Sequence, residues 1–375
     1  MRAGFVIRSI ARIFLPFWLA AFAVAQTSQL SLEKRQQLEA AIARFMAANH
    51  IPAVSVAVVE NGAESWSAGF GNADLENSVP ATAHTLYRLA SISKSITATA
   101  AMLLWQQGKL DLDAPVQKYC SAFPQKDATV TTRELLGHLA GIRAYKSWTQ
   151  DDPEYGNTRH FADPIQGGLD FFKSDPLISK PGAEFHYTTE GFTLVGCAIE
   201  GASGRKYVDY VREHLLLPAG MTHTVPDDRF AIIPGRARFY SRDKSGAIVN
   251  ADFLDSSYKI PGGGWLSSAE DVAAFEIAML DDRILTQATR NLMWTPPKLG
   301  DGKKNDYALG WGTGTEAGYP DVGHAGGQQG TTTFFMIVPA KRAGIVVLMN
   351  IDEGNAMALA IELMKIVLAP PGGSS

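Results

Sequence analysis

The sequence contains little cysteine and no surplus of basic residues. Only Cys120 and Cys197 occur among 375 residues, which is too few for a framework of several disulfides. The sequence does not place their Cα atoms within bridging range, so we expect two unpaired thiols, although pairing in an oxidising compartment stays open. A formal net charge of −4 leaves no broad basic face, and we therefore expect no nucleic-acid partner.

Motifs of several common enzyme classes are also missing. The chain has no H-E-x-x-H motif and no clustered Cys and His ligands, so we expect neither a metal nor another cofactor. It has no G-x-S-x-G, which argues against the triad of the α/β-hydrolases. The segment GWGTG (residues 310–314) lacks the spacing of a dinucleotide-binding loop.

A targeting signal is present at the amino terminus. Three arginines precede the apolar run IFLPFWLAAFAVA (residues 13–25), which ends in an A-x-A site. This pattern predicts a signal peptide in residues 1–25 that is cleaved after Ala25, with an uncleaved anchor as the alternative. No second run of spanning length follows. We therefore expect a secreted or periplasmic protein that is free of the membrane once the signal is removed.

The first part of the mature chain shows clear helix and strand patterns. Residues 32–49 predict a helix capped by Ser31, and a hairpin is predicted around Asn61-Gly62. Residues 92–107 predict a second helix, because apolar side chains recur there at helical spacing.

The rest of the chain divides into two blocks. Helices, loops and prolines dominate about residues 109–235, whereas strand patterns and a last helix occupy about 236–375. Sheet partners at both ends of the chain predict an α+β fold, an antiparallel sheet flanked by N- and C-terminal helices plus an all-helical lobe. Residues 26–375 then form one unit, whose α/β lobe comprises about 26–108 and 236–375.

A serine and a lysine stand three residues apart at the start of the helix over 92–107. Side chains at i and i+3 share a helix face, so the amine of Lys94 can reach the hydroxyl of Ser91. A serine needs a neighbouring base to become a nucleophile, and burial together with the positive helix end favours the neutral amine. A solvated lysine in a capped first turn is the alternative. The spacing alone is weak evidence, because it also occurs from Ser31, Ser203, Ser241 and Ser256.

Five segments support the catalytic interpretation by their order along the chain. They are LASISKSITATAAMLLWQQGKLDLDAPV, TTRELLGHLAGI, PGAEFHYTTEGFTLVGCAIEGASG, GGGWLSSAEDVAAF and GHAGG. This order resembles the serine β-lactamase-like proteins, which include class C β-lactamases, penicillin-binding D-Ala-D-Ala peptidases and related esterases. RARFY, SYKIPGGGWLSS and MWTP look most like the LACTB-type branch of β-lactamase-like peptidases. The resemblance covers roughly residues 35–365 and implies a β-lactamase/transpeptidase-like fold.

The resemblance implies a set of catalytic residues. Ser91 takes the place of the nucleophile that accepts the acyl group, and Lys94 that of its proton partner. Tyr187, which opens YTTEG, matches the tyrosine that acts as base and then delivers a proton to the leaving group. His324 of GHAGG occupies the place of a lysine on the strand beside the site, and the family pattern makes it catalytic.

The resemblance also implies the groups that bind the substrate. The backbone N–H groups of Ser91 and Gly327 would form the oxyanion hole, and Thr189, Gly326 and Gly327 would contact the substrate. Two of the family positions carry unusual residues. Thr189 stands where asparagine is frequent, and His324, near neutral at pH 7, replaces a permanently charged lysine. Both changes favour peptide or ester hydrolysis over strong β-lactamase activity.

The expected function is therefore that of an exported serine hydrolase that forms an acyl-enzyme on Ser91 and cleaves peptide or amide bonds. A carboxylesterase or a weak β-lactamase working at the same site is the first alternative. A non-catalytic, peptide-binding scaffold of the same fold is the second. The expected partner is a small-molecule or peptide substrate. His138 in LLGHLAGI is interpreted as a structural residue that holds a loop.

Overall fold

The protein is described by a computed structural model that covers residues 1, 29–300, 302 and 305–370. The predicted signal peptide and its cleavage site after Ala25 lie, apart from Met1, outside these described residues. Within the described part, no helix combines the length and apolar character needed to cross a membrane.

One large sheet forms the centre of the molecule. Its strands are β1 (Ala53–Glu60), β2 (Ala63–Asp74), β3 (Val79–Pro80), β9 (Gly312–Glu316), β10 (Tyr319–Gln328), β11 (Thr331–Val338) and β12 (Ala343–Met349). They lie in the order β3-β2-β1-β12-β11-β10-β9, and each neighbouring pair is antiparallel. Strands from the two ends of the chain meet at its centre, where Val54 of β1 is opposite Met349 of β12. The predicted α+β fold with an antiparallel sheet is confirmed.

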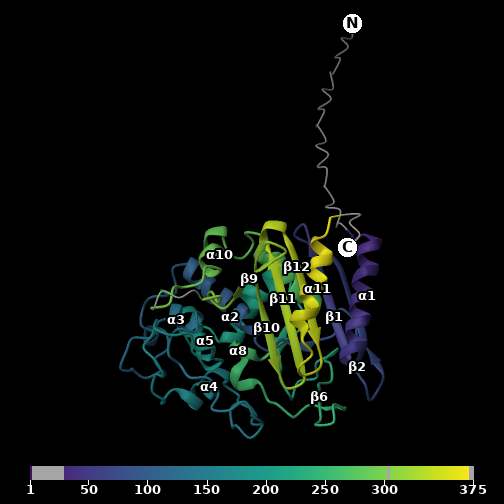
Figure 1. Cartoon of the computed structure of the whole chain (residues 1–375). Helices are drawn as coiled ribbons and strands as arrows, with labels where there is room; N and C mark the ends of the chain where they lie inside the picture. The colour runs from purple at the N-terminus through teal and green to yellow at the C-terminus, as the bar shows by residue number, and fades with distance from the viewer. Residues whose placement is uncertain (2–28, 301, 303–304, 371–375) are drawn as a thin grey trace.

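Helices cover both faces of this sheet. On one face α1 (Leu32–Asn49) packs beside α11 (Ala356–Leu368), as the purple and yellow helices of Figure 1 show. On the other face lie α2 (Ile92–Gln106) and α9 (Ala269–Leu280). Strand β1 is consequently apolar on both sides. Val54 and Val56 belong to the core under α1 and α11, while Ala53 and Ala57 belong to the core around α2.

Shorter elements complete the fold. The helices are α3 (Thr132–Leu136), α4 (Pro164–Phe172), α5 (Glu190–Ser203), α6 (Tyr207–Val211), α7 (Leu217–Ala219), α8 (Ile260–Gly263) and α10 (Gln287–Met293). Single turns are η1 (Val116–Lys118), η2 (Arg212–Leu216), η3 (Ser257–Lys259) and η4 (Pro339–Lys341). Two small sheets contain β4 (Tyr87–Arg88), β5 (Val225–Pro226) and β8 (Trp265–Ser267), and β6 (Tyr240–Arg242) with β7 (Ile248–Asn250). Helices α3, α4 and α5 gather on the side of Figure 1 away from α1.

Local signals in the sequence placed several of these elements correctly. The hydroxyl of Ser31 accepts a hydrogen bond from the Lys34 backbone N–H at the start of α1. Asn61 and Gly62 both adopt positive φ, 55° and 78°, in the tight turn between β1 and β2. Asparagine and glycine tolerate this left-handed region, which is why they mark such a hairpin.

The two cysteines form a disulfide, so the expectation of free thiols is wrong. Cys120 follows η1 and Cys197 lies within α5, with their Cα atoms 5.4 Å apart. The two residues are separated by 77 positions in the chain. Their pairing depends on how α5 packs against η1, and the sequence carried no local signal for that contact.

Candidate active site

Ser91 stands immediately before α2, at the end of a short segment that leaves the small sheet. The segment is held on both sides, because Leu89 donates its N–H to Trp265 and its carbonyl oxygen accepts from the Thr333 hydroxyl at 2.9 Å. Ser91 already has helical dihedral angles, and its side chain makes no capping hydrogen bond to the helix. The Ser91 hydroxyl is therefore available to its side-chain neighbours.

Lys94 is completely buried beside Ser91. The first thirteen residues of α2 are all buried, so a lysine in its first turn cannot extend to solvent. Its Nζ lies 3.0 Å from the Ser91 Oγ, 3.3 Å from the Thr189 Oγ1 and 2.7 Å from the carbonyl oxygen of Gly262. Burial, and then the charge of Lys259, lowers the pKa of Lys94 to about 7. A neutral amine has two N–H donors and one lone pair. The two donors match the oxygens of Thr189 and Gly262, and the lone pair can accept the Ser91 hydroxyl proton.

Tyr187 faces the same hydroxyl from the loop before α5. Its phenol is hydrogen-bonded to the Ser91 side chain, and the Lys94 Nζ lies 4.8 Å from the centre of its ring. Burial raises the pKa of Tyr187 well above its ordinary value, and the contact with Ser91 only partly opposes this shift. The phenol consequently keeps its proton near neutral pH. The structure thus brings Ser91, Lys94 and Tyr187 together, as the sequence predicts.

His138 holds the loop that carries Tyr187, as its structural interpretation predicts. The backbone N–H of Thr188 donates to the His138 Nδ1 at 3.2 Å, and the N–H of His186 donates to the His138 carbonyl oxygen. The imidazole lies 4.3 Å from the Tyr187 ring, centre to centre. Burial lowers the pKa of His138 well below its ordinary value, so the ring is neutral.

Strand β10 brings the two predicted glycines to the nucleophile. A Cβ on Gly326 would lie 2.2 Å from the Thr333 Oγ1 and 2.3 Å from the Leu89 carbonyl oxygen, so only glycine fits there. A Cβ on Gly327 would meet no atom within 4 Å. Both glycines line one cleft of about 370 Å³ with Ser91, Tyr187 and Thr189.

The edge of β10 is open beside this cleft. β9 pairs with β10 only as far as Gly323, so residues 324–328 have no strand partner on that side within the described part of the chain. Unpaired backbone groups on a strand edge can bind an extended substrate backbone. The opposite part of the cleft carries the aromatic rings of Tyr145, Trp148 and Tyr155.

His324 lies near the predicted site but does not line this cleft. Its Nε2 is 2.9 Å from the Tyr307 hydroxyl and its Nδ1 is 2.6 Å from the Ala325 carbonyl oxygen. Burial, and then the nearby Lys94, lowers the pKa of His324 to about 3. The imidazole is therefore neutral and both its nitrogens already have partners, which favours a positioning role over a charged one.

Several residues of the cleft are not predicted from the sequence, and Lys259 is the one that carries a charged group. Its side chain is only 3% exposed, and it lines the cleft with Ser91. Lys259 and Ser256 form one of the four S-x-x-K pairs that the chain contains besides Ser91 and Lys94. The other three lysines lie at the surface or in ion pairs, because Lys34 binds Glu60 and Lys206 binds Asp163, whereas Lys244 is exposed. Only its burial beside the cleft distinguishes Lys259, and spacing cannot reveal burial.

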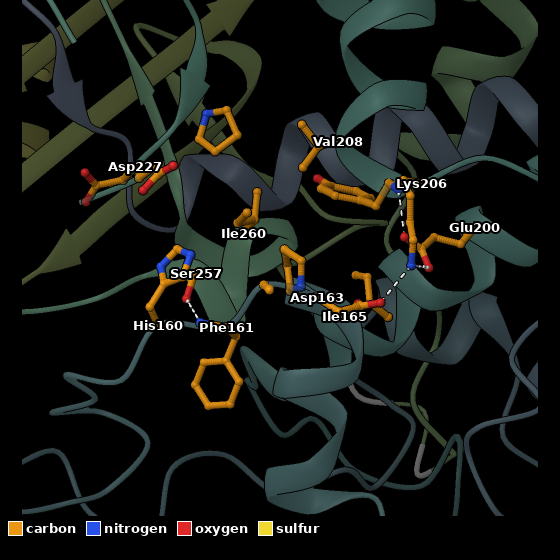
Figure 2. A pocket seen from close by; sticks show the side chains of 15 residues that line it. His160, Phe161, Asp163, Ile165, Glu200, Lys206, Val208, Asp227, Ser257 and Ile260 are labelled. Carbon is orange, nitrogen blue, oxygen red and sulfur yellow. Dashed lines mark hydrogen bonds and ion pairs between the residues drawn. The ribbon is translucent and has the colours of Figure 1, made fainter. Parts of the chain in front are cut away.

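A second cavity, of about 300 Å³, lies between the starts of α4 and α6, the residues around β5, and η3. Figure 2 shows Lys206 directed at Asp163 and Glu200, with nitrogen–oxygen distances of 2.7 and 3.7 Å. The Phe161 N–H donates to the Ser257 hydroxyl at 2.8 Å in the same view. The Lys206 amine and the Ser257 hydroxyl therefore already have partners within the cavity wall. Among the described residues, no group of three or more His, Cys, Asp or Glu side chains is placed to hold a metal ion.

A serine precedes α2 and a buried lysine lies in the first turn of that helix, beside an antiparallel sheet. This arrangement is typical of serine hydrolases of the penicillin-binding-protein type. The comparison with known families agrees, and the chain belongs to the Beta-lactamase family, whose pattern matches residues 38–368.

Individual relatives support this assignment. The chain is 32% identical over 380 residues to the human serine beta-lactamase-like protein LACTB, mitochondrial, covering 77% of this chain and 69% of that protein. It is 27% identical over 334 residues to Protein flp of Staphylococcus aureus (strain MW2), covering 87% of this chain and 65% of that protein. Among solved structures, the octameric penicillin-binding protein homologue from Pyrococcus abyssi superimposes with a TM-score of 0.76 at 27% identity. This match covers 89% of this chain and 77% of that one.

Proposed function

We propose that the protein is an exported hydrolase that cleaves peptide or amide bonds through an acyl-enzyme on Ser91. One observation carries this proposal. Hydrogen bonds to Thr189 and Gly262 fix the Lys94 amine, so that its lone pair is directed at the Ser91 hydroxyl oxygen, 3.0 Å from the Nζ. A buried, neutral amine in this position is a competent general base.

Acylation follows from the protonation states at the site. The Ser91 Oγ attacks the substrate carbonyl carbon while its proton passes to the neutral Lys94 amine. The backbone N–H groups of Ser91 and Gly327 stabilise the oxyanion that develops. Tyr187 then donates its phenolic proton to the leaving nitrogen, the C–N bond breaks, and the Lys94 ammonium restores the proton of Tyr187. Tyr187 is thus assigned the role of proton donor, because its raised pKa disfavours a phenolate base.

Deacylation again uses Lys94 as the base. A water molecule attacks the acyl carbon of the Ser91 ester, and Lys94 accepts its proton. The ester C–O bond breaks, and Ser91 recovers its proton from the Lys94 ammonium. The products are a carboxylic acid and the free enzyme.

The shape of the cleft favours a peptide or amide as substrate over an ester or β-lactam. The free edge of β10 beyond Gly323 offers hydrogen bonds that an extended peptide backbone can use. The rings of Tyr145, Trp148 and Tyr155 provide apolar contact area for side chains. His324 is neutral and lies outside the cleft, so it supplies no fixed charge for a β-lactam carboxylate.

Two features support export. The pattern in residues 1–25 is that of a signal peptide. The chain has a Cys120–Cys197 disulfide, and disulfides persist mainly in oxidising compartments outside the cytoplasm.

Active-site labelling tests the proposal. A fluorophosphonate probe is expected to label the wild type at one site, and Ser91→Ala is expected to abolish the labelling. Tyr187→Phe is expected to lower kcat on a peptide amide by about 10²–10⁴-fold, the usual contribution of a positioned proton donor. Assays with a peptide panel, p-nitrophenyl esters and nitrocefin then separate peptidase from esterase and β-lactamase. Equal labelling of wild type and Ser91→Ala, or labelling of neither, would instead support the non-catalytic scaffold.

A further inference from the structure

Lys259 sits within the proposed active site without a role in the acyl-transfer steps. It ends η3 immediately before α8, the short helix whose Gly262 carbonyl oxygen accepts from Lys94. A Cβ on Gly263 would lie 3.8 Å from the Lys259 Cδ and 3.6 Å from the Gln328 Oε1. The stem of Lys259 and the side chain of Gln328, at the end of β10, therefore both lie close to Gly263, and all three residues line the cleft.

The Lys259 amine has no counterion and no hydrogen-bond acceptor among the residues that the structure describes. Its near neighbours are aromatic, with the centres of the Tyr145 and Tyr258 rings 5.7 and 5.6 Å from its Nζ. A buried ammonium that lacks a partner is costly, and natural proteins rarely bury one without a function. Lys259 lines the cleft that also contains Ser91.

The two carboxylates whose charge acts on Lys259, Asp227 and Glu190, form no ion pair with it. Asp227 accepts from Arg88 at 2.8 Å and from Arg236 at 3.2 Å, on its two oxygens. Glu190 accepts from the Thr188 hydroxyl at 2.9 Å, and burial, with the neighbouring Glu154, raises the pKa of Glu190 to about 8. Both carboxylates act on Lys259 only through their longer-range charge. Among the described residues, no carboxylate forms an ion pair with the Lys259 amine, which leaves it available to an anion of the substrate.

We propose that Lys259 binds a carboxylate of the substrate, so that the enzyme selects peptides or amides that carry a negative charge close to the scissile bond. A single carboxylate neutralises a single ammonium, whereas a phosphate would bring about two negative charges at pH 7 into a cleft with one free cation among the described residues. The inference rests on the proposed function, because it assigns the substrate of the same cleft.

The electrostatics of the cleft agree with this assignment. Burial, and then the charge of Arg88, lowers the pKa of Lys259 to about 7, while Glu190 and Asp227 oppose the shift. Lys94 is the neighbouring amine whose pKa the charge of Lys259 lowers. A bound carboxylate would favour the charged amine and replace its lost hydration with charge-assisted hydrogen bonds. His324 is neutral, so it offers no competing charge.

Paired substrates test the proposal. The first pair consists of two aryl esters with the same acylglycyl group, whose leaving group is 3-hydroxybenzoate or 3-hydroxybenzamide. The second pair consists of p-nitrophenyl esters whose acyl group ends in a carboxylate or in the corresponding carboxamide. In at least one pair, the wild type is expected to prefer the carboxylate in kcat/KM by about tenfold or more, the usual effect of a hydrogen bond to a charged group.

Variants at position 259 then show whether the lysine causes the preference. Lys259→Met is expected to reduce the ratio of the two kcat/KM values to near one, whatever happens to the rate on each ester. Lys259→Arg is expected to keep part of the ratio, and Lys118→Met, which removes an exposed lysine, is expected to keep all of it. Where turnover is slow, the same compounds are compared as competitors against fluorophosphonate labelling of Ser91.

The outcomes separate the two proposals. If the probe labels Ser91 but neither pair shows a carboxylate preference, the Lys259 proposal is wrong and the proposed hydrolase stands. The same holds if Lys259→Met slows both members of each pair equally, because Lys259 would then act through Lys94. If Ser91 is not labelled and no compound is hydrolysed, the proposed function itself fails.

Discussion

The carbonyl oxygen of Gly262 accepts a 2.7 Å hydrogen bond from the Lys94 Nζ, although the two residues are 168 positions apart. Together with Thr189, this bond uses the two N–H donors of a neutral amine. The remaining lone pair is then directed at Ser91, 3.0 Å away. Helix α2 follows the serine and contains the lysine, whereas Gly262 of α8 and Thr189 orient the lysine amine toward the serine.

The first prediction concerns the pH dependence of acylation on an uncharged substrate. Lys94 acts as a base only when it is neutral, and its pKa is lowered to about 7 by burial and by Lys259, with Glu190 opposing. We therefore expect kcat/KM for the carboxamide ester to rise with pH through about 7 and then to level off, because kcat/KM reports the free enzyme. Initial rates between pH 5 and 9 measure this profile.

A charge deletion provides the control for this profile. The charge of Lys259 lowers the pKa of Lys94, so Lys259→Met should move the inflection to higher pH. Lys206→Met, which removes a surface lysine that is paired with Asp163, should leave the inflection in place. A profile that is flat through neutrality, or that shifts downward in Lys259→Met, would contradict the assignment of Lys94 as the base.

Sequence motifs located much of this site, for a physical reason. Ser91 and Lys94 share one helix turn, and Tyr187 and the glycines of β10 stand in short segments whose residue types are set by local geometry. Gly326 is an example, because the Thr333 hydroxyl and the Leu89 carbonyl oxygen leave no room for a Cβ. The order of such segments along the chain therefore indicated both the fold and the residues that meet.

Contacts between distant segments could not be predicted in the same way. The pairing of Cys120 with Cys197 and the partner of His324, the Tyr307 hydroxyl, both depend on packing between elements. Lys259 is the clearest case. Its spacing from Ser256 is the same as that of Lys94 from Ser91, and only the folded structure shows that it is buried beside the cleft.

The second prediction concerns the close approach of β10 to the nucleophile. In Gly326→Ala the new Cβ would lie 2.2 Å from the Thr333 Oγ1 and 2.3 Å from the Leu89 carbonyl oxygen, so the strand has to move. We expect the free energy of unfolding to fall by about 1–3 kcal/mol, as for other overpacked sites. We also expect kcat/KM to fall, because the displacement separates Gly327 from Ser91. Urea unfolding and ester hydrolysis measure the two effects.

The neighbouring glycine is the matched control for stability. A Cβ at Gly327 meets no atom within 4 Å, so Gly327→Ala should change the free energy of unfolding by less than about 0.5 kcal/mol. Equal destabilisation by the two substitutions would mean that strand propensity, and not contact with Leu89, decides the effect. That result would remove the packing argument for Gly326.

The third prediction concerns the disulfide between Cys120 and α5. Closing a loop over a sequence separation of 77 residues restricts the unfolded chain, so Cys120→Ala with Cys197→Ala should lower the free energy of unfolding by about 2–5 kcal/mol. Neither cysteine lines the cleft, and the folded double variant should keep its activity at room temperature.

Urea unfolding with and without dithiothreitol separates the crosslink from the packing of the side chains. Reductant should destabilise the wild type by a similar amount and leave the double variant unchanged, because only the wild type has a bond to lose. Cys120 and Cys197 are both buried, so their replacement also removes some packing, and the reduced wild type measures the crosslink alone. A wild type whose unfolding does not respond to reductant would show that the bond is not formed in solution. The disulfide would then no longer support export, and the signal pattern of residues 1–25 would carry that proposal alone.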